Sequence, residues 1–127
     1  MDVKFYKCNV CGNVAVKLTD SGVKMVCCSE EMTDLIPNSD DTAALEKHVP
    51  VVTQNGREIE VKVGSVDHPM IPEHFIQWIY LVTNKNNYSR RLTPGESPVA
   101  KFNLSEDEMM IRAYEYCNLH GLWVVEG

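Results

Sequence analysis

The chain has 127 residues, of which 44% are hydrophobic, so it can bury one good core with a small satellite module. Its net charge of −6 is offset by no basic run, which argues against nucleic acid as the main partner. The longest apolar stretch, 75–82, is too short to span a bilayer, and the first five residues lack the layout of a signal peptide. Five cysteines without a secretion signal then indicate a reducing compartment, so we expect a cytoplasmic protein.

The N-terminal segment is predicted to be a small module built around a metal. It contains a C-x-x-C pair followed later by two adjacent cysteines: Cys8, Cys11, Cys27 and Cys28. Four thiolates suit a tetrahedral site that holds zinc or a single iron. Strand-like runs at 14–18 and 23–26 predict a hairpin. Because so short a segment buries little core, we expect the metal to supply folding free energy.

The rest of the chain reads as a linker and a second domain. The polar, turn-rich stretch after residue 36 predicts a linker at 37–44, which leaves 1–36 as the module and 45–127 as the second domain. Within that domain, Asn55-Gly56 predicts a hairpin turn. The predicted strands are 49–54, 57–63, 75–83, 88–92, 99–104, 109–117 and 122–125. Short strands with regular turns and no helix predict an all-β fold, an antiparallel sandwich of immunoglobulin-like type.

The histidines lie between these strands, and a cysteine joins them. His48 precedes the first strand, and His68 and His74 share a proline-stiffened loop. Cys117 stands three positions before His120. A thiolate and imidazoles together suit iron, copper or zinc far better than magnesium or calcium. Every cysteine and histidine of the chain is thereby assigned to one of two candidate metal sites.

These motifs resemble a known family. C-x-x-C followed by C-C resembles the desulforedoxin-like domain, a small rubredoxin-type iron centre. The motifs E-K-H-V-P, H-P-M with a second histidine six residues after the first, and C-N-x-H-G resemble superoxide reductase of the neelaredoxin type. Together, from about residue 5 to the end, the chain resembles the two-iron desulfoferrodoxins.

The resemblance implies two irons, an activity and partners. It assigns a four-cysteine iron to the N-terminal module and a catalytic ferrous ion to the ligands His48, His68, His74, His120 and Cys117. It implies one-electron reduction of superoxide to hydrogen peroxide without release of dioxygen, as a defence of an anaerobe or microaerophile against oxidative stress. It further implies a homodimer and rubredoxin or a similar small protein as electron donor.

Two neighbouring charged residues receive roles from the same resemblance. Lys47 is assigned to attracting superoxide and stabilising the product, and Glu46 to ligating the ferric ion after turnover. Lys47 also answers a physical difficulty, since an acidic protein repels an anion at long range. Salt screening limits the range over which exposed charges act to roughly 8–10 Å. A cation beside the site can therefore still steer the substrate, whereas more distant acidic groups have little effect on it.

Other classes of function compete with this interpretation. A blue-copper electron-transfer protein also uses cysteine and histidine on a β-sandwich, but it normally needs an axial methionine that 121–127 lacks. An iron electron-transfer protein without catalysis is a further alternative. A zinc-stabilised interaction module is compatible with the four-cysteine cluster, but it leaves the histidine and cysteine set unexplained.

Overall fold

The computed structural model describes residues 3–42 and 47–127. The chain forms two compact units, Met1–Ile36 and Pro37–Gly127. All regular structure in the described part of the chain is β-strand, which confirms the all-β prediction. Within those residues, no helix has the length and hydrophobicity that crossing a membrane requires.

The first unit is built from very short strands. Its sheet has the order β2-β1-β5, and a separate ribbon pairs β3 with β4. The bounds are β1 (Phe5–Lys7), β2 (Val14–Val16), β3 (Val26–Cys27), β4 (Glu30–Glu31) and β5 (Thr33–Asp34). Among the described residues of this unit, only Phe5 and Cys8 are buried hydrophobics. So small a core cannot offset the conformational entropy of the unit by itself.

The hairpin predicted between 14–18 and 23–26 is wrong. β2 pairs with β1, and β3 pairs with β4. The intervening segment is held by side chains: Lys17 Nζ lies 2.9 Å from Asp20 Oδ1 and 2.7 Å from the Val23 carbonyl oxygen. Asp20 Oδ1 also accepts the Gly22 amide at 2.8 Å. These contacts make a compact loop where the pattern suggested two paired strands.

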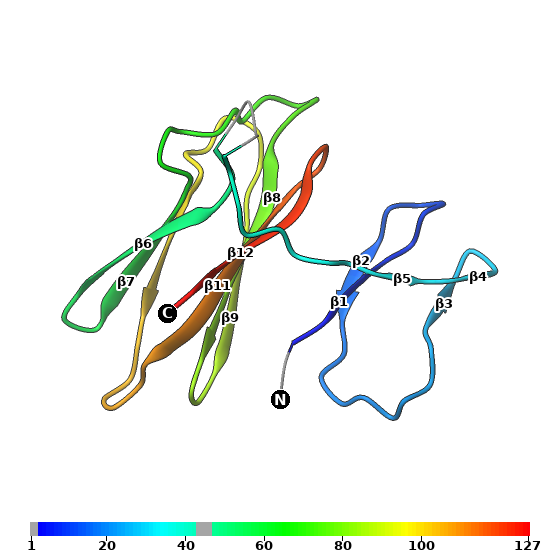
Figure 1. Ribbon diagram of the computed structural model, residues 1–127, viewed down its shortest axis with the longest axis horizontal. Coiled ribbons are helices and arrows are strands. Elements are labelled where there is room, and N and C mark those ends of the chain that lie inside the picture. The colour runs from blue at the N-terminus through cyan, green and yellow to red at the C-terminus, as the bar shows by residue number, and fades with distance from the viewer. Residues whose placement is uncertain (1–2, 43–46) are drawn as a thin grey trace. The chain divides into compact units, whose positions relative to one another are not determined.

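The second unit is a sandwich of two antiparallel sheets (Figure 1). One sheet has the order β10-β7-β6 and the other β12-β11-β8-β9. The bounds are β6 (Pro50–Asn55), β7 (Glu58–Val63), β8 (Ile76–Thr83), β9 (Asn87–Arg91), β10 (Val99–Asn103), β11 (Met110–Cys117) and β12 (Gly121–Glu126). Each predicted strand of the sandwich is present within a few residues. The β6–β7 turn is shifted by one position, because Asn55 pairs with Glu58 and the turn residues are Gly56 and Arg57.

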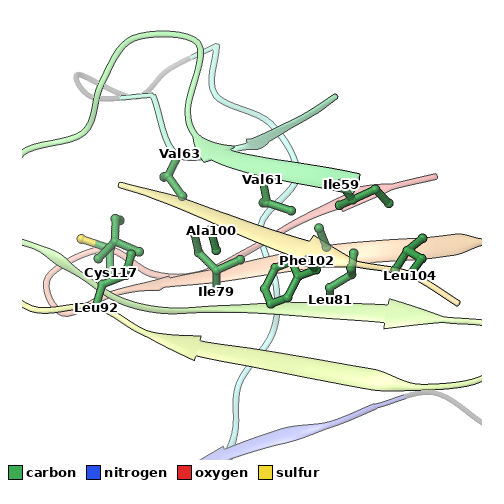
Figure 2. Close-up of a cluster of buried hydrophobic side chains, with 12 residues drawn as sticks. Ile59, Val61, Val63, Ile79, Leu81, Leu92, Ala100, Phe102, Leu104 and Cys117 are labelled. Atoms are coloured by element: carbon green, nitrogen blue, oxygen red, sulfur yellow. The ribbon is translucent and has the colours of Figure 1, made fainter. Parts of the chain in front are cut away.

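Strand alternation explains how the sandwich core forms. Ile59, Val61 and Val63 of β7 are fully buried, and the residues between them are not. Figure 2 shows these three side chains along β7, directed towards Ile79 and Leu81 of the opposite sheet. Burying each such side chain contributes roughly 1.5–3 kcal/mol. Cys117 belongs to the same buried cluster, so the core places a thiol at the end of β11.

Residue 38 shows that the predicted linker is attached to the second unit. The Asn38 amide donates to the Leu122 carbonyl oxygen at 2.9 Å, and the Val124 amide donates to the Asn38 carbonyl oxygen at 2.9 Å. Asn38 also forms an isolated parallel bridge with Trp123. The beginning of the predicted linker, at residue 38, therefore pairs with the edge of β12.

A buried carboxylate, Glu108, joins two loops at the end of the sandwich remote from the histidines. It accepts hydrogen bonds from the Thr83 hydroxyl, the Tyr88 hydroxyl at 2.7 Å, the Ser105 amide at 2.8 Å and the Asn86 side-chain amide at 3.2 Å. Burial opposes its charge, but these donors outweigh burial and lower the pKa of Glu108 from 4.5 to about 2.

We expect Glu108→Gln to destabilise the second unit in a pH-dependent way. Since the folded pKa lies below the unfolded one, the ionised carboxylate stabilises the fold above about pH 4.5, and that contribution is lost as the pH falls towards 2. The melting temperature of the variant should therefore lie several degrees below that of the parent at neutral pH, with a gap that narrows in acid. Thermal melts followed by circular dichroism, with the exposed Glu106→Gln as control, measure this. A gap of constant size from pH 7 to pH 3 would contradict the role given to the charge.

Candidate metal centres

Five side chains of the second unit meet at one end of the sandwich. His48 precedes β6, His68 and His74 lie between β7 and β8, Cys117 ends β11, and His120 lies in the turn before β12. Each offers one donor atom, and all these atoms lie within 4.8 Å of one another. The tertiary structure thus brings together residues that the sequence separates by up to 72 positions, counted from 48 to 120.

The four imidazoles form a closed square. His48 contacts His68 and His120 with ring centroids 4.6 and 4.9 Å apart. His74 contacts the same two rings at 4.7 and 5.1 Å. Each ring therefore has two neighbours, in the cyclic order 48, 68, 74 and 120. This is the arrangement that four nitrogen ligands need around the equator of one ion.

Distances between donor atoms match a metal site. Nε2 of His48 and Nε2 of His68 are 3.0 Å apart. Neighbouring nitrogens on an octahedral ion with bonds of about 2.1 Å are also separated by about 3.0 Å. Cys117 Sγ lies 3.8 Å from Nδ1 of His120. This is less than the roughly 4.4 Å that one metal–sulfur and one metal–nitrogen bond can span together.

Hydrogen bonds prepare the rings for a metal. Nδ1 of His68 lies 2.8 Å from the Pro69 carbonyl oxygen. A carbonyl oxygen only accepts, so this contact places the proton on Nδ1 and leaves Nε2 unprotonated, as a metal ligand must be. Nε2 of His74 is buried and has no hydrogen-bond partner in the structure. An orphaned buried nitrogen is costly unless it binds something else, and a metal ion fits that need.

Neighbouring residues fix the positions of the ligands. Asn118 accepts the Phe75 amide at 2.9 Å and donates to the Glu73 carbonyl oxygen at 3.0 Å, which ties the cysteine turn to the loop of His74. Trp123 stacks on His48 with ring centroids 4.7 Å apart. Its indole nitrogen donates to the His120 carbonyl oxygen at 3.2 Å. Neither role is visible in the sequence, because both depend on contacts between segments.

The two charged residues predicted beside the site differ in what the structure describes. Lys47 is half-buried, and its Nζ donates to the Asp41 carbonyl oxygen at 3.3 Å. Glu46 lies outside the described residues. The backbone of Lys47 is thus adjacent to that of His48, and a flexible aliphatic chain links this backbone to the ammonium group.

Glu115 is a buried carboxyl group that the sequence analysis missed. It lies on β11 two positions before Cys117, is fully buried, and neither carboxyl oxygen has a hydrogen-bond partner in the structure. Burial, and secondarily the charge of Asp41, raises the pKa of Glu115 well above its usual range. No sequence signal pointed to it, because residues 113–117 of β11 are all buried and the strand shows no alternation there.

The four cysteines of the first unit form the second candidate centre. The sulfurs of Cys11 and Cys27 are 3.6 Å apart, and those of Cys27 and Cys28 are 4.0 Å apart. A tetrahedral ion with metal–sulfur bonds of about 2.3 Å separates its sulfurs by about 3.8 Å. Successive side chains in a strand point to opposite faces, so two adjacent cysteines cannot normally share an ion. Cys28 departs from strand geometry with φ of 53°, which allows both thiols to face one site.

The thiol pKa values show why this cluster needs a cation. Hydrogen bonds from the backbone amides of Cys11 and Val10 lower the pKa of Cys8 to about 6. Hydrogen bonding with the side chains of Cys11 and Cys8, followed by that with Cys27, raises the pKa of Cys28 to about 12. Without a cation, the cluster therefore does not hold four thiolates at neutral pH. A bound metal ion removes this penalty by neutralising the sulfur charges.

Comparison with known proteins agrees with this geometry. The family model for desulfoferrodoxin matches residues 40–126, and the model for the desulfoferrodoxin N-terminal domain matches residues 2–35. The chain belongs to the desulfoferrodoxin family. A desulfoferrodoxin from Syntrophotalea carbinolica is 48% identical over 125 residues, which cover 98% of this chain and 97% of the relative.

Proteins named superoxide reductase are also similar to this desulfoferrodoxin family member. The crystal structure of the superoxide reductase from Treponema pallidum superposes with a TM-score of 0.82 at 36% identity and covers 98% of both chains. A superoxide reductase from Thermococcus kodakarensis is 35% identical over 95 residues, which cover 61% of this chain and 83% of the relative. The family and the two ligand groups fit two iron sites, as the sequence predicted.

Proposed function

We propose that this protein is a superoxide reductase whose catalytic iron is held by His48, His68, His74, His120 and Cys117. The observation that carries the proposal is the closed square of four imidazoles next to a fully buried thiol. These residues would hold an iron ion with four nitrogens and one sulfur, and they would leave room for one further ligand. Cys117 is completely buried whereas His120 is exposed, so the ligand group reaches solvent on the side of His120.

When bound, the iron supplies the one electron that converts superoxide, with two protons, into hydrogen peroxide. The protein's own residues do the rest. Lys47 attracts the anion to the site, because a cation within the screening length of about 8–10 Å outweighs more distant acidic groups. Trp123 covers His48 and excludes water from that side of the ring square. We assign Glu46 to the role of a further ligand, which would bind the ferric ion after turnover.

We assign the second iron to Cys8, Cys11, Cys27 and Cys28. Residues 1–36 are then the desulforedoxin-like module, 37–44 the linker and 45–127 the catalytic domain. We further propose that the protein acts in the cytoplasm as a homodimer and takes electrons from rubredoxin or a similar small protein. The one-electron chemistry supports such a donor, since each superoxide consumed requires one electron from outside.

Metal analysis and a superoxide assay test the proposal together. We expect about two irons per chain, one in sulfur-only and one in nitrogen-rich coordination, with visible colour in the oxidised protein. Superoxide should be consumed with one hydrogen peroxide formed per superoxide and no dioxygen released. Zinc at both sites with no visible absorption would contradict the proposal and favour the alternative of a zinc-stabilised interaction module. Two irons without peroxide formation would indicate electron transfer alone.

A further inference from the structure

The backbone that carries Lys47 and His48 is held by a residue outside both metal centres. One carboxylate oxygen of Asp41 accepts the His48 amide at 2.8 Å, and the other accepts the Val49 amide at 2.9 Å. The Asp41 carbonyl oxygen accepts the Lys47 ammonium at 3.3 Å. A single aspartate therefore binds three consecutive residues. Hydrogen bonds to a carboxylate are roughly twice as strong as those between neutral groups.

Gly64 meets the same segment from the other side. It is buried just after the end of β7. A methyl group at this position would lie 2.6 Å from the Lys47 carbonyl oxygen and 2.8 Å from the Lys47 carbonyl carbon. Real Cβ contacts essentially never fall below 3.0 Å. Since both clashing atoms are backbone, no side-chain rotation relieves the contact, and the segment of Lys47 would have to move.

We propose that Asp41 and Gly64 are positioning residues, which act as a two-sided clamp on the segment 47–49. The clamp sets where His48 enters the ring square and where the stem of Lys47 begins. His48 comes before β6, so its backbone lies outside the paired residues of the sheet. The two carboxylate–amide hydrogen bonds and the close contact with the glycine position this backbone instead.

The clamp matters because ligand geometry tolerates little error. The Nε2 atoms of His48 and His68 stand at the 3.0 Å separation that one ion requires. Functional groups have to be held within about 0.5 Å of their working geometry. Bringing the 2.6 Å contact into the ordinary range, which begins at 3.4 Å, requires the backbones of Lys47 and residue 64 to separate by 0.8 Å, which is more than that amount. The metal consequence of the clamp rests on the proposed iron site, whereas the hydrogen bonds themselves do not.

Two disruptive variants and two matched controls test the clamp in the full, iron-loaded chain. Asp41→Ala removes both acceptors, and Gly64→Ala introduces the clash. Asp40→Ala is the first control, since Asp40 accepts the Thr42 amide at 2.9 Å and interacts with the clamped segment only through the charge of Lys47, not through its backbone. Gly56→Ala is the second, because it strains a φ of +64° but meets no atom within 4 Å. Asp41→Asn keeps one acceptor and should restore part of the loss.

Hydrogen exchange read by mass spectrometry reports the clamp directly. We expect the amides of His48 and Val49 to exchange at least about 10-fold faster in Asp41→Ala. We expect a chelator to remove the nitrogen-coordinated iron about 10–100-fold faster from Asp41→Ala and Gly64→Ala, because losing a partner that orients a metal ligand lowers metal affinity by about 10–100-fold. The four-cysteine iron should keep its spectrum, and both controls should match the parent.

The outcomes separate this inference from the proposed function. Parent-like exchange and iron release in Asp41→Ala would overturn the clamp, and this holds even if Gly64→Ala fails to fold. Fast iron release from Gly56→Ala would also overturn it, because general destabilisation would then explain the loss. A parent that shows protected amides and slow iron release but no reduction of superoxide would support the clamp and overturn the proposed function.

Discussion

Replacing Cys117 with serine should abolish superoxide reduction while leaving the sandwich folded. The thiol is fully buried and belongs to the core cluster, and its sulfur is the only soft donor of the nitrogen-rich site. Losing a residue that merely orients a metal ligand lowers metal affinity or activity by about 10- to 100-fold. Losing the ligand itself should therefore lower the second-order rate constant for superoxide by more than about 100-fold. The visible band from sulfur to iron should disappear, which absorption spectroscopy of the oxidised protein measures.

A neighbouring position supplies the control for this variant. Ala113 lies on the same strand, faces the same core and is also fully buried. Ala113→Ser therefore places a hydroxyl group in a comparable apolar environment without touching a ligand. It should lower thermal stability but keep the iron, the visible band and the activity. A Cys117→Ser protein that retained the band would show that another residue supplies the sulfur.

Replacing Cys28 with serine should remove the other iron and loosen the first unit only. That unit buries little apolar surface in its described residues, so its order depends on the metal. Limited proteolysis should cut within 1–36 far faster than in the parent, while the second unit stays resistant. Because the ligands that we propose for the catalytic iron all lie in the second unit, superoxide reduction should persist when an artificial electron donor is supplied.

Ser29→Ala is the matched control for Cys28→Ser. Ser29 follows Cys28 and shares its unusual backbone, with φ of 63°, but it belongs to neither metal group. This control should keep both irons and resist the protease. If Cys28→Ser loses activity with the artificial donor while its nitrogen-coordinated iron remains, the first centre is an obligatory part of turnover.

The sequence revealed most clearly what is encoded locally. The spacing of Cys8 and Cys11 and the adjacency of Cys27 and Cys28 identify a thiol cluster, because chelation by neighbouring residues limits spacing strongly. Alternation along 57–63 predicted one buried face, and the structure confirms it with three inward residues. The hairpin at 14–18 and 23–26 was wrong because short apolar runs do not specify their partner. Cys27, directly after the second run, instead lies in one group with the thiols of Cys8 and Cys11.

The sequence by itself determined which side chains form the two candidate metal groups and which faces of the strands are buried. Both follow from residue type and from periods of a few residues. Only the tertiary structure decided how four separated imidazoles close into a square, and which residues hold them there. Asn118, Trp123, Asp41 and Gly64 act through contacts between segments that lie far apart in the chain. Such contacts leave no local pattern, because they arise only when the two sheets pack and bring their loops to one end.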